Sequence, residues 1–283
     1  KLLKSEAEVK MAFEYACKLD VFSIKPGNVF FNHPAYGMTH KDFLQSSMAC
    51  SDIICENGMD IGIKVLECVK ASFDVVGCNT NLGIILLCAP IVEAIYLDKD
   101  HKFLQSNLKI VIDGIDEKQT ASIYEAINMA HAGGMGSKEE FDLNEDNSSN
   151  FRLFEAMSFA SSYDYIASEY ISYFHNIINT ISPSWRNYFN NMKDDKCATT
   201  ATFLNLISST PDSLIARKHG ESVAKEVSAR FKDISDDYCS SEAPKNLNNK
   251  LLLLDSELKI QGLNPGTTAD VVVASIFLNR LGL

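Results

Sequence analysis

Apolar residues recur along this chain with the three- and four-residue spacing of amphipathic helices. The first helix places four such residues on one face, namely Ala12, Tyr15, Ala16 and Leu19. Further helices are predicted at 41–57, 60–73, 80–97, 102–113, 118–131, 150–181, 197–208, 212–234, 247–260 and 265–281. One β-like stretch, Val29 to Phe31, is too short for a sheet, and no period-two alternation accompanies it. The sequence therefore predicts an all-α protein.

Two of the predicted helices, 80–97 and 265–281, are apolar on nearly every side and should be buried. They lie far apart in the sequence, so each needs the other to form a core. The stretches 133–150 and 240–249 are rich in polar and small residues and are predicted to be loops within one domain. We therefore expect residues 1–283 to form a single compact multi-helix domain.

Each of these two helices opens with polar residues and glycine. Asn79, Thr80 and Asn81 stand at the start of one, and Asn264-Pro265-Gly266-Thr267-Thr268 at the start of the other. Asn264 is suited to cap its helix, with the proline in the first turn. Backbone amides and the helix dipole favour an anion at such an end, so both starts together could bind a polyphosphate. The alternative is a pair of ordinary capped core helices, and starts that lie far apart in space would exclude a shared site.

The charge and the cysteines narrow the range of partners. A net charge of -11 argues against binding to nucleic acid or to an anionic membrane. The eight cysteines form no CxxC pair and no zinc-ligand spacing, which is typical of reduced residues in a cytoplasmic protein. The apolar run from Leu82 to Ile95 is shorter than the roughly 20 residues that cross a bilayer. The sequence thus predicts a cytoplasmic protein without a membrane segment, and it leaves the oligomeric state open.

A Lys-Pro-Gly-Asn turn follows the first helix. It contains Lys25, Gly27 and Asn28. The turn either simply ends the helix or presents the lysine to a phosphate from a rigid position.

The helix predicted to begin at Asp212 carries further candidates. On a helical wheel Arg217 and His219 flank its buried stripe, while Lys218 points away from it. The first two could reach inward, or they could be boundary residues whose polar ends extend to water. Asp212 could cap the helix or hold one of them. Gly220, placed within the predicted helix, suggests close approach of a neighbour or ligand.

Carboxylates gather in the central loop and on the helix predicted after it. Glu139, Glu140 and Asp142 could hold Mg²⁺, which prefers oxygen ligands, although a solvated acidic loop is the alternative. Glu155 and Asp164 are weaker candidates beside apolar positions. No Walker, HExxH or GxSxG motif is present, so the sequence does not favour those hydrolase classes.

Taken together, these motifs resemble the triphosphoribosyl-dephospho-CoA synthase family. Lys25-Pro26-Gly27 is similar to a Lys-Pro-Gly near the family's start, and Gly77-Cys78-Asn79-Thr80 to its Gly-x-Asn-Thr-His-Lys-Gly segment. Asp212 to Gly220 resembles an Asp-Thr-Asn stretch followed by His-Arg-Gly. Leu263 to Asp270 resembles the closing helix start, Ser/Asn-Pro-Gly-Gly/Thr-Ser/Thr-Ala-Asp, which is the most specific motif. Order and spacing match over nearly the whole chain.

The resemblance implies an all-α enzyme whose substrates are ATP and a dephospho-CoA-like acceptor. The family joins the ribose of ATP to the 2′-hydroxyl of 3′-dephospho-CoA, releases adenine and keeps the triphosphate. The implied substrate- and phosphate-binding residues are Lys25, Gly27, Asn28, Asn79, Thr80, Asn81, Arg217, Asn264, Gly266, Thr267 and Thr268.

The resemblance also assigns catalytic roles. Mg²⁺ would be held by Asp270 with Glu139 and Asp142, and Asp270 would belong to the catalytic set as well. Asp212, or Glu155 as the weaker alternative, would take the proton of the acceptor hydroxyl. His219 would donate a proton to the departing adenine, since an unperturbed histidine titrates near pH 6.5.

The chain departs from the family pattern at one informative place. Where the family has His-Lys after Asn-Thr, this chain has Asn81-Leu82, so a cation expected at the phosphates is absent. The departure indicates a divergent branch and keeps two alternatives open. One is a related transferase with a different acceptor, for example in one-carbon carrier biosynthesis, and the other is a non-catalytic nucleotide- or coenzyme-binding protein. An all-α scaffold for protein partners would leave both polar helix starts unexplained.

Overall fold

The computed structural model describes residues 4–97, 104–131 and 151–283, and within these ranges the chain forms helices and turns without a strand. The all-α prediction is therefore confirmed. The helices are α1 (Glu6–Phe22), α2 (His40–Cys55), α3 (Ile61–Val76), α4 (Leu82–Leu97), α5 (Leu104–Asp113), α6 (Glu117–Ala130), α7 (Leu153–Ala160), α8 (Tyr165–Ile171), α9 (Ser182–Met192), α10 (Asp195–Ser209), α11 (Ser213–His219), α12 (Glu221–Ser240), α13 (Asn248–Ile260) and α14 (Gly266–Leu281).

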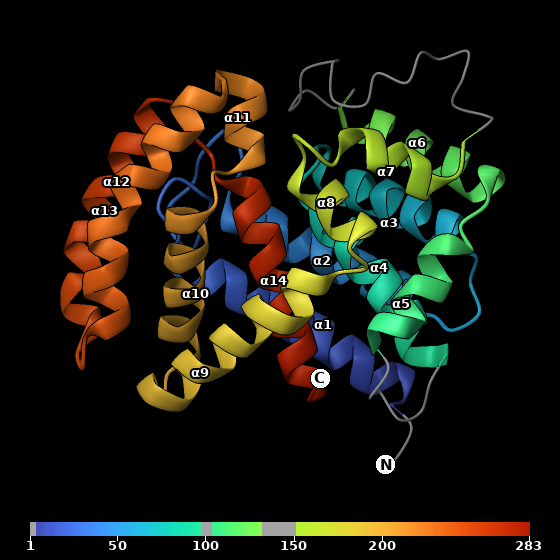
Figure 1. Cartoon of the computed structure of the whole chain (residues 1–283), viewed down its shortest axis with the longest axis horizontal. Helices are drawn as coiled ribbons and strands as arrows, with labels where there is room; N and C mark the ends of the chain where they lie inside the picture. Colours follow the sequence, from blue (N-terminus) through green and yellow to red (C-terminus); the bar gives the residue numbers. More distant parts are fainter. Residues whose placement is uncertain (1–3, 98–103, 132–150) are drawn as a thin grey trace.

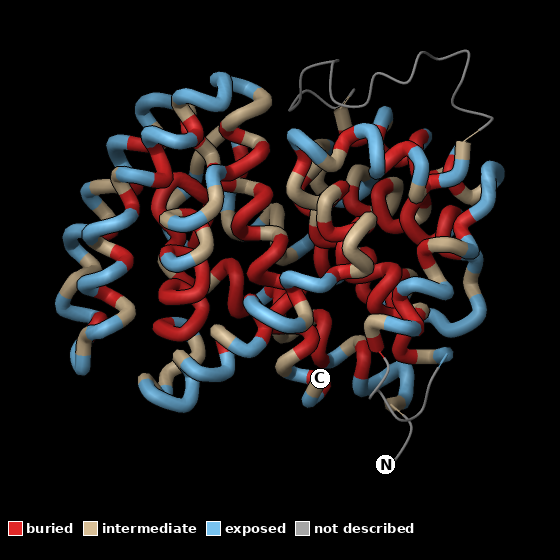
Figure 2. Tube along the Cα trace, viewed as in Figure 1, coloured by how far each residue is buried: buried red, intermediate tan, exposed pale blue. Residues whose placement is uncertain are grey.

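Helices α4 and α14 form the centre of the molecule, although one comes from the first third of the chain and the other from its end. They pack against each other, and α14 also packs against α1, α9 and α10 (Figure 1). Nearly every residue of both helices is buried, from Ile84 to Val92 in α4 and from Val271 to Leu278 in α14. The buried trace in Figure 2 is concentrated around them, and exposed residues lie on the outer helices. The helices predicted to form the core do so.

Several helices begin where a polar side chain satisfies amides that have no partner inside the helix. Ser5 and Glu8 form a reciprocal capping box at α1. Asp60, Asp164 and Asp194 each accept a hydrogen bond from an amide in the first turn of α3, α8 and α10. These side chains set where the helices start and therefore how the connecting segments enter the core.

The single helix predicted over 150–181 is wrong for the residues that the structure describes. The chain there forms α7, then α8, then a π-helical turn at Ile177–Ile181. Asp164 caps α8 in the middle of the predicted span, and Tyr173 and Phe174 have φ angles of 52° and 60°, which interrupt a right-handed helix. The following helix α9, with Pro183 in its first turn, was missed by the sequence analysis.

The helix predicted over 212–234 is also divided. Gly220 has φ 94° and ψ 154°, so α11 ends at His219 and α12 begins at Glu221. A Cβ at Gly220 would meet nothing within 4 Å, so the expected close approach of a neighbour is wrong. The glycine serves the positive φ of a helix junction.

Two sequence expectations concern membranes and cysteines. None of the helices in the described ranges is long and apolar enough to cross a membrane. All eight cysteines are unpaired, and six of them are buried. The cysteines therefore act as small apolar side chains in the packing.

Candidate functional site

A cavity of about 750 Å³ lies where the starts of α4 and α14 meet. Asn79 and Thr80 line it from the segment that leads into α4, and Gly266, Thr267 and Asp270 line it from the first turns of α14. The two helix starts are thus brought together, which is the geometry that a shared phosphate site requires.

Glycine permits the close approach of the two helices at this cavity. A Cβ at Gly83 would lie 2.0 Å from Oδ2 and 2.8 Å from Cγ of Asp270. These distances are far below van der Waals contact, so any larger residue at position 83 would displace the carboxylate. Gly83 therefore fixes how Asp270 faces the cavity.

Asp270 is the carboxylate that α14 places on the cavity wall. Burial raises its pKa well above the usual value, and the charges of Asp20 and Asp212 raise it further, while Lys25 opposes them. Among the described residues, Asp270 accepts no hydrogen bond and forms no ion pair. Its position and environment fit a group that meets a cation or a proton supplied by a ligand.

Lys25 lies one layer behind the cavity wall. Its side chain is fully buried, and its ammonium group donates to Oδ1 of Asp20 at 2.5 Å and to Oδ1 of Asn28 at 3.0 Å. Asp20 and Asn28 line the cavity, but Lys25 does not. Burial raises the pKa of Asp20 even though Lys25 lowers it. The lysine thus holds two lining residues, and any contact of its own with a phosphate stays a prediction.

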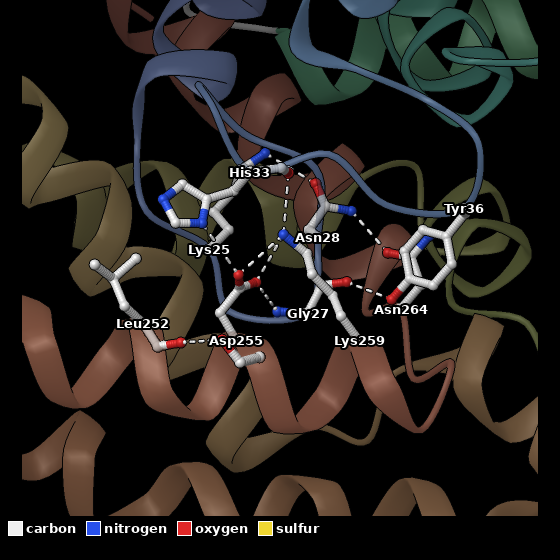
Figure 3. Close-up of polar contacts among 10 residues, drawn as sticks. Lys25, Gly27, Asn28, His33, Tyr36, Leu252, Asp255, Lys259 and Asn264 are labelled. Atoms are coloured by element: carbon white, nitrogen blue, oxygen red, sulfur yellow. Dashed lines mark hydrogen bonds and ion pairs between the residues drawn. The ribbon is translucent and has the colours of Figure 1, made fainter.

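Side chains from α13 and from the segment that follows the turn hold the Lys-Pro-Gly turn in place (Figure 3). The amide of Gly27 donates to Oδ1 of Asp255 at 2.8 Å, and the hydroxyl of Tyr36 donates to the Gly27 carbonyl at 2.6 Å. Asp255 is buried and also pairs with Lys259 at 3.0 Å. Gly27 itself has φ 87°, and a Cβ there would lie 2.8 Å from the carbonyl oxygen of Leu263. The turn therefore packs directly against the segment that leads into α14.

The predicted capping role of Asn264 is wrong. Pro265 occupies the cap position of α14 and supplies no side-chain cap, and the amide of Thr268 in the first turn donates to Asp212. Oδ1 of Asn264 instead accepts a hydrogen bond from Nδ2 of Asn28 at 2.8 Å. This contact links the Lys-Pro-Gly turn to the start of α14.

Asp212 is engaged in structure. Its Oδ1 accepts from the amides of Leu214 and Ile215, at 2.9 and 3.1 Å, and its Oδ2 accepts from the amide and hydroxyl of Thr268, both at 2.7 Å. The capping role is therefore confirmed, and the same carboxylate ties α11 to α14. Burial raises the pKa of Asp212 despite the bonds from Thr268. Neither Asp212 nor Thr268 lines the cavity, so a catalytic role for Asp212 stays an untested prediction to which its four hydrogen bonds lend no support.

The end of α11 faces the cavity differently from the helical-wheel prediction. Arg217 lines the cavity and donates to Oδ2 of Asp164 at 2.9 Å. Lys218, which was expected to point away, also lines it. His219 is exposed, lies 3.2 Å from the Gly262 carbonyl and is not part of the wall. The wheel was drawn across the break after α11, which explains the error.

The residues before α4 divide into lining and supporting groups. Asn79 accepts from the amide of Leu82 at 3.1 Å, and the Thr80 hydroxyl donates to Ser46. Asn81 is buried against Ser72 and does not line the cavity. Leu82 does line it, at the position where the family pattern has lysine. Among the described residues, Arg217 and Lys218 are the lysines and arginines that line this wall.

The predicted metal ligands are only partly placed. Glu139 and Asp142 lie outside the described residues, and within the described ranges no group of three His, Cys, Asp or Glu side chains forms a metal site. Glu155 accepts from the amide of Arg152 at the start of α7 and is exposed. Mg²⁺ requires only one or two carboxylates when phosphates and water complete its shell, and the unpaired Asp270 fits such a ligand.

Two residues on the wall were underrated by the sequence analysis. In the sequence Asp164 gives only a weak signal beside apolar positions and His131 gives none, yet both line the cavity. His131 follows α6, and Asp164 follows α7, so neither lies near the motifs in sequence. No local pattern points to them, because only the packing of α6 and α8 brings them to this wall.

The comparisons with known proteins agree with this architecture. The family model described as ATP:dephospho-CoA triphosphoribosyl transferase matches residues 6–283. A crystal structure from Archaeoglobus fulgidus, provisionally described as a triphosphoribosyl-dephospho-CoA synthase, is similar with a TM-score of 0.60. It is 24% identical to this chain, and the match covers 83% of this chain and 96% of that one, which establishes similarity of fold. A search of curated protein sequences finds no match.

Proposed function

Because the chain belongs to the ATP:dephospho-CoA triphosphoribosyl transferase family, we propose that it transfers the triphosphoribosyl group of ATP to the 2′-hydroxyl of 3′-dephospho-CoA. The observation that carries this proposal is the convergence of the α4 and α14 starts on one cavity with the unpaired carboxylate of Asp270. In the reaction the C1′–N9 bond of ATP breaks and a C1′–O2′ bond forms. The hydroxyl proton ends on the released adenine, so the reaction needs no redox partner.

The triphosphate is assigned to the end of the cavity formed by the helix starts. The backbone amide of Thr267 lies in the first turn of α14, where the helix dipole favours anions and no side chain caps it, whereas the amide of Gly266 already donates to the carbonyl of Asn264 at 2.9 Å. Arg217 and Lys218 add positive charge from α11. Asn28 and Asn264, which hydrogen bond to each other, position the turn beside this helix start.

Asp270 is assigned to the charged centre of the reaction. With Mg²⁺ bound there, the metal would offset charge on the triphosphate oxygens and help to hold the substrate in one orientation. The carboxylates of Asp270 and Asp20 face the same cavity, so they can stabilise the positive charge that develops on the ribose when adenine departs. Asp212 is assigned to support, because its oxygens already accept four hydrogen bonds.

The decisive experiment is incubation of the purified protein with ATP, Mg²⁺ and 3′-dephospho-CoA, followed by liquid chromatography and mass spectrometry. Free adenine together with a coupled triphosphoribosyl product is the expected result. ATP-dependent thermal stabilisation without adenine would replace the proposal with a nucleotide-binding protein, which is the second candidate. Leu82 on the wall favours that candidate, since it removes a cation that the family pattern places there. Absence of both signals would overturn both candidates.

Substituting the histidine at the end of α11 and the histidine after α6 tests which of them donates a proton to the departing adenine. His131 lines the cavity, whereas His219 is outside its wall. We expect His131→Gln to lower kcat for adenine release by about 100-fold, within the range for loss of a general acid, and His219→Gln to leave it within about twofold. A larger loss of kcat for His219→Gln than for His131→Gln would assign the general-acid role to His219, as the sequence suggested.

A further inference from the structure

A second cavity, of about 400 Å³, lies beside the first. One side of it is formed by the segment between α7 and α8, including Ser162 and Tyr163, and the other by α11 and the start of α12. The mechanism above does not use this cavity.

The two cavities share one wall. Asp164 and Arg217 line both of them, and these residues form an ion pair with 2.9 Å between Arg217 Nη1 and Asp164 Oδ2. Asp164 is held in place because its other oxygen accepts from the amide of Ala167 at 2.8 Å. Molecules bound in the two cavities would therefore both lie against this pair.

The second cavity is suited to the base of a nucleotide, whereas the first is assigned to the triphosphate. Its lysine, Lys225, pairs with Glu221 at 3.7 Å, and Arg217 pairs with Asp164, so each described cation on the wall has a carboxylate partner. Tyr163, which is 53% exposed, can stack on a base, an interaction that tolerates any base and needs no charge.

We propose that this second cavity binds the nucleoside end of the acceptor, and that the acceptor ribose meets the ribose of ATP at the Asp164–Arg217 pair. The inference rests on the proposed function. A reaction that joins two nucleotides must hold both at once, and two contiguous cavities with one shared wall satisfy this requirement. The exposed side of the cavity at Ser162 leaves an exit for the diphosphate and the arm that follows it in dephospho-CoA.

Calorimetric titration of the full chain with 3′-dephospho-CoA tests the proposal, with inorganic triphosphate present to occupy the first cavity without reacting. Tyr163→Ala should weaken acceptor binding about tenfold, while Tyr163→Phe, which keeps the ring, should stay within about twofold. Ser162→Trp should block the cavity and weaken binding at least about tenfold. Ser158→Trp places the same bulk on exposed α7, outside the lining, and is its control. ATP affinity should stay within about twofold in all four variants.

The outcomes separate this inference from the proposed function. If the wild-type protein releases adenine but Tyr163→Ala and Ser162→Trp bind the acceptor normally, the second cavity is not the acceptor site and the transferase proposal stands. If both variants lose affinity for ATP as well, the two cavities are not separate subsites and the inference fails. If the wild-type protein binds ATP but neither binds dephospho-CoA nor releases adenine with it, both proposals fail. Thermal melts of each variant confirm that any loss does not come from unfolding.

Discussion

The start of α14 and the start of α4 face the same cavity but are built from different chemistry. The first turns of α14 carry Asp270 and are tied to the rest of the protein by Asp212, a buried carboxylate that binds Thr268. The start of α4 is held by neutral groups, such as Asn79 on the Leu82 amide and Thr80 on Ser46. The start of α14 thus contributes a charged side chain to the cavity, whereas the start of α4 contributes neutral side chains that shape its wall.

This difference explains why the chain can depart from its family pattern on one side only. Leu82 replaces a lysine at the start of α4, while the Asn-Pro-Gly-Thr-Thr-Ala-Asp motif of α14 is retained. The charge at α14 belongs to a buried network with Asp20, Asp212 and Lys25, so a substitution there changes the balance among several buried groups. A neutral helix start tolerates substitution more easily.

The largest effect is expected from removing the charge at the start of α14. Asp270→Asn should lower kcat for adenine release by about 1,000-fold, because under the proposed function the carboxylate would face the reacting ribose and hold the metal. Asn79→Ala, at the start of α4, should cost only about tenfold, since it removes one neutral support. Steady-state kinetics of both variants provide the measurement. Equal losses of kcat would contradict the proposed difference between the two helix starts.

A smaller loss is expected from Gly83→Ala, which changes shape alone. The new methyl group would displace the Asp270 carboxylate, and misplacement of a reacting group by about 1 Å can cost about 100-fold in rate. We expect kcat to fall by that factor while the helical circular dichroism spectrum is unchanged. Gly77→Ala tests a nearby glycine whose Cβ would meet nothing within 4 Å but whose φ is 77°. Kinetic loss restricted to Gly83→Ala supports the shape argument, and full activity of that variant contradicts it.

Introducing a cation at the start of α4 tests whether charge at this helix start affects ATP binding. Leu82→Lys is expected to lower KM for ATP about tenfold, equivalent to about 1.4 kcal/mol, if the first cavity holds the triphosphate. The gain should shrink at high salt because it is electrostatic. Leu82→Met preserves the size and apolar character and should leave KM unchanged. A gain in both variants would point to packing as its cause.

The smallest effect concerns stability and pH. Burial raises the folded-state pKa of Asp270 above the value of 3.8 expected in the unfolded chain, so the folded state binds the extra proton between these two values. Stability contributed by this group is therefore lost as pH rises through that window, with a slope of at most about 1.4 kcal/mol per pH unit. Urea unfolding as a function of pH should show a flatter profile for Asp270→Asn. The variant should be more stable than wild type at neutral pH, and a steeper profile would contradict this assignment.

Much of the fold follows from local patterns. The periodicity of α1 to α6, α10, α13 and α14 predicts each of these helices within a few residues, because an apolar stripe, or in α4 and α14 an apolar surface on nearly every side, runs along each of them without a break. The same reasoning failed at Asp164 and Gly220, where apolar residues continue on both sides of a break. There a single capping carboxylate or a single positive φ decides the structure, and periodicity averaged over many residues does not detect it.

The candidate site shows the same division. The motifs around Asn79, Asn264 and Asp270 were identifiable because helix starts are local features. Asp255 and Lys259 were missed, since a carboxylate and a lysine four residues apart are typical of a solvated helix face. Because α13 packs against the Lys-Pro-Gly turn, these two side chains point inward. There Asp255 accepts a hydrogen bond from the Gly27 amide.

By itself the sequence determined that this chain is helical and that α4 and α14 are buried, and it led to the hypothesis of an anion site at their polar starts. These properties depend on the chemistry of neighbouring residues and survive without knowledge of the fold. Tertiary structure decided which carboxylate remains available: Asp212 is satisfied by amides from two helices, and Asp270 is not. It also decided that Lys218 lines the cavity in place of His219 and that Asp164 lies between two cavities. Such facts depend on which helices meet, because a side chain's burial and hydrogen-bond partners come from residues distant in the sequence.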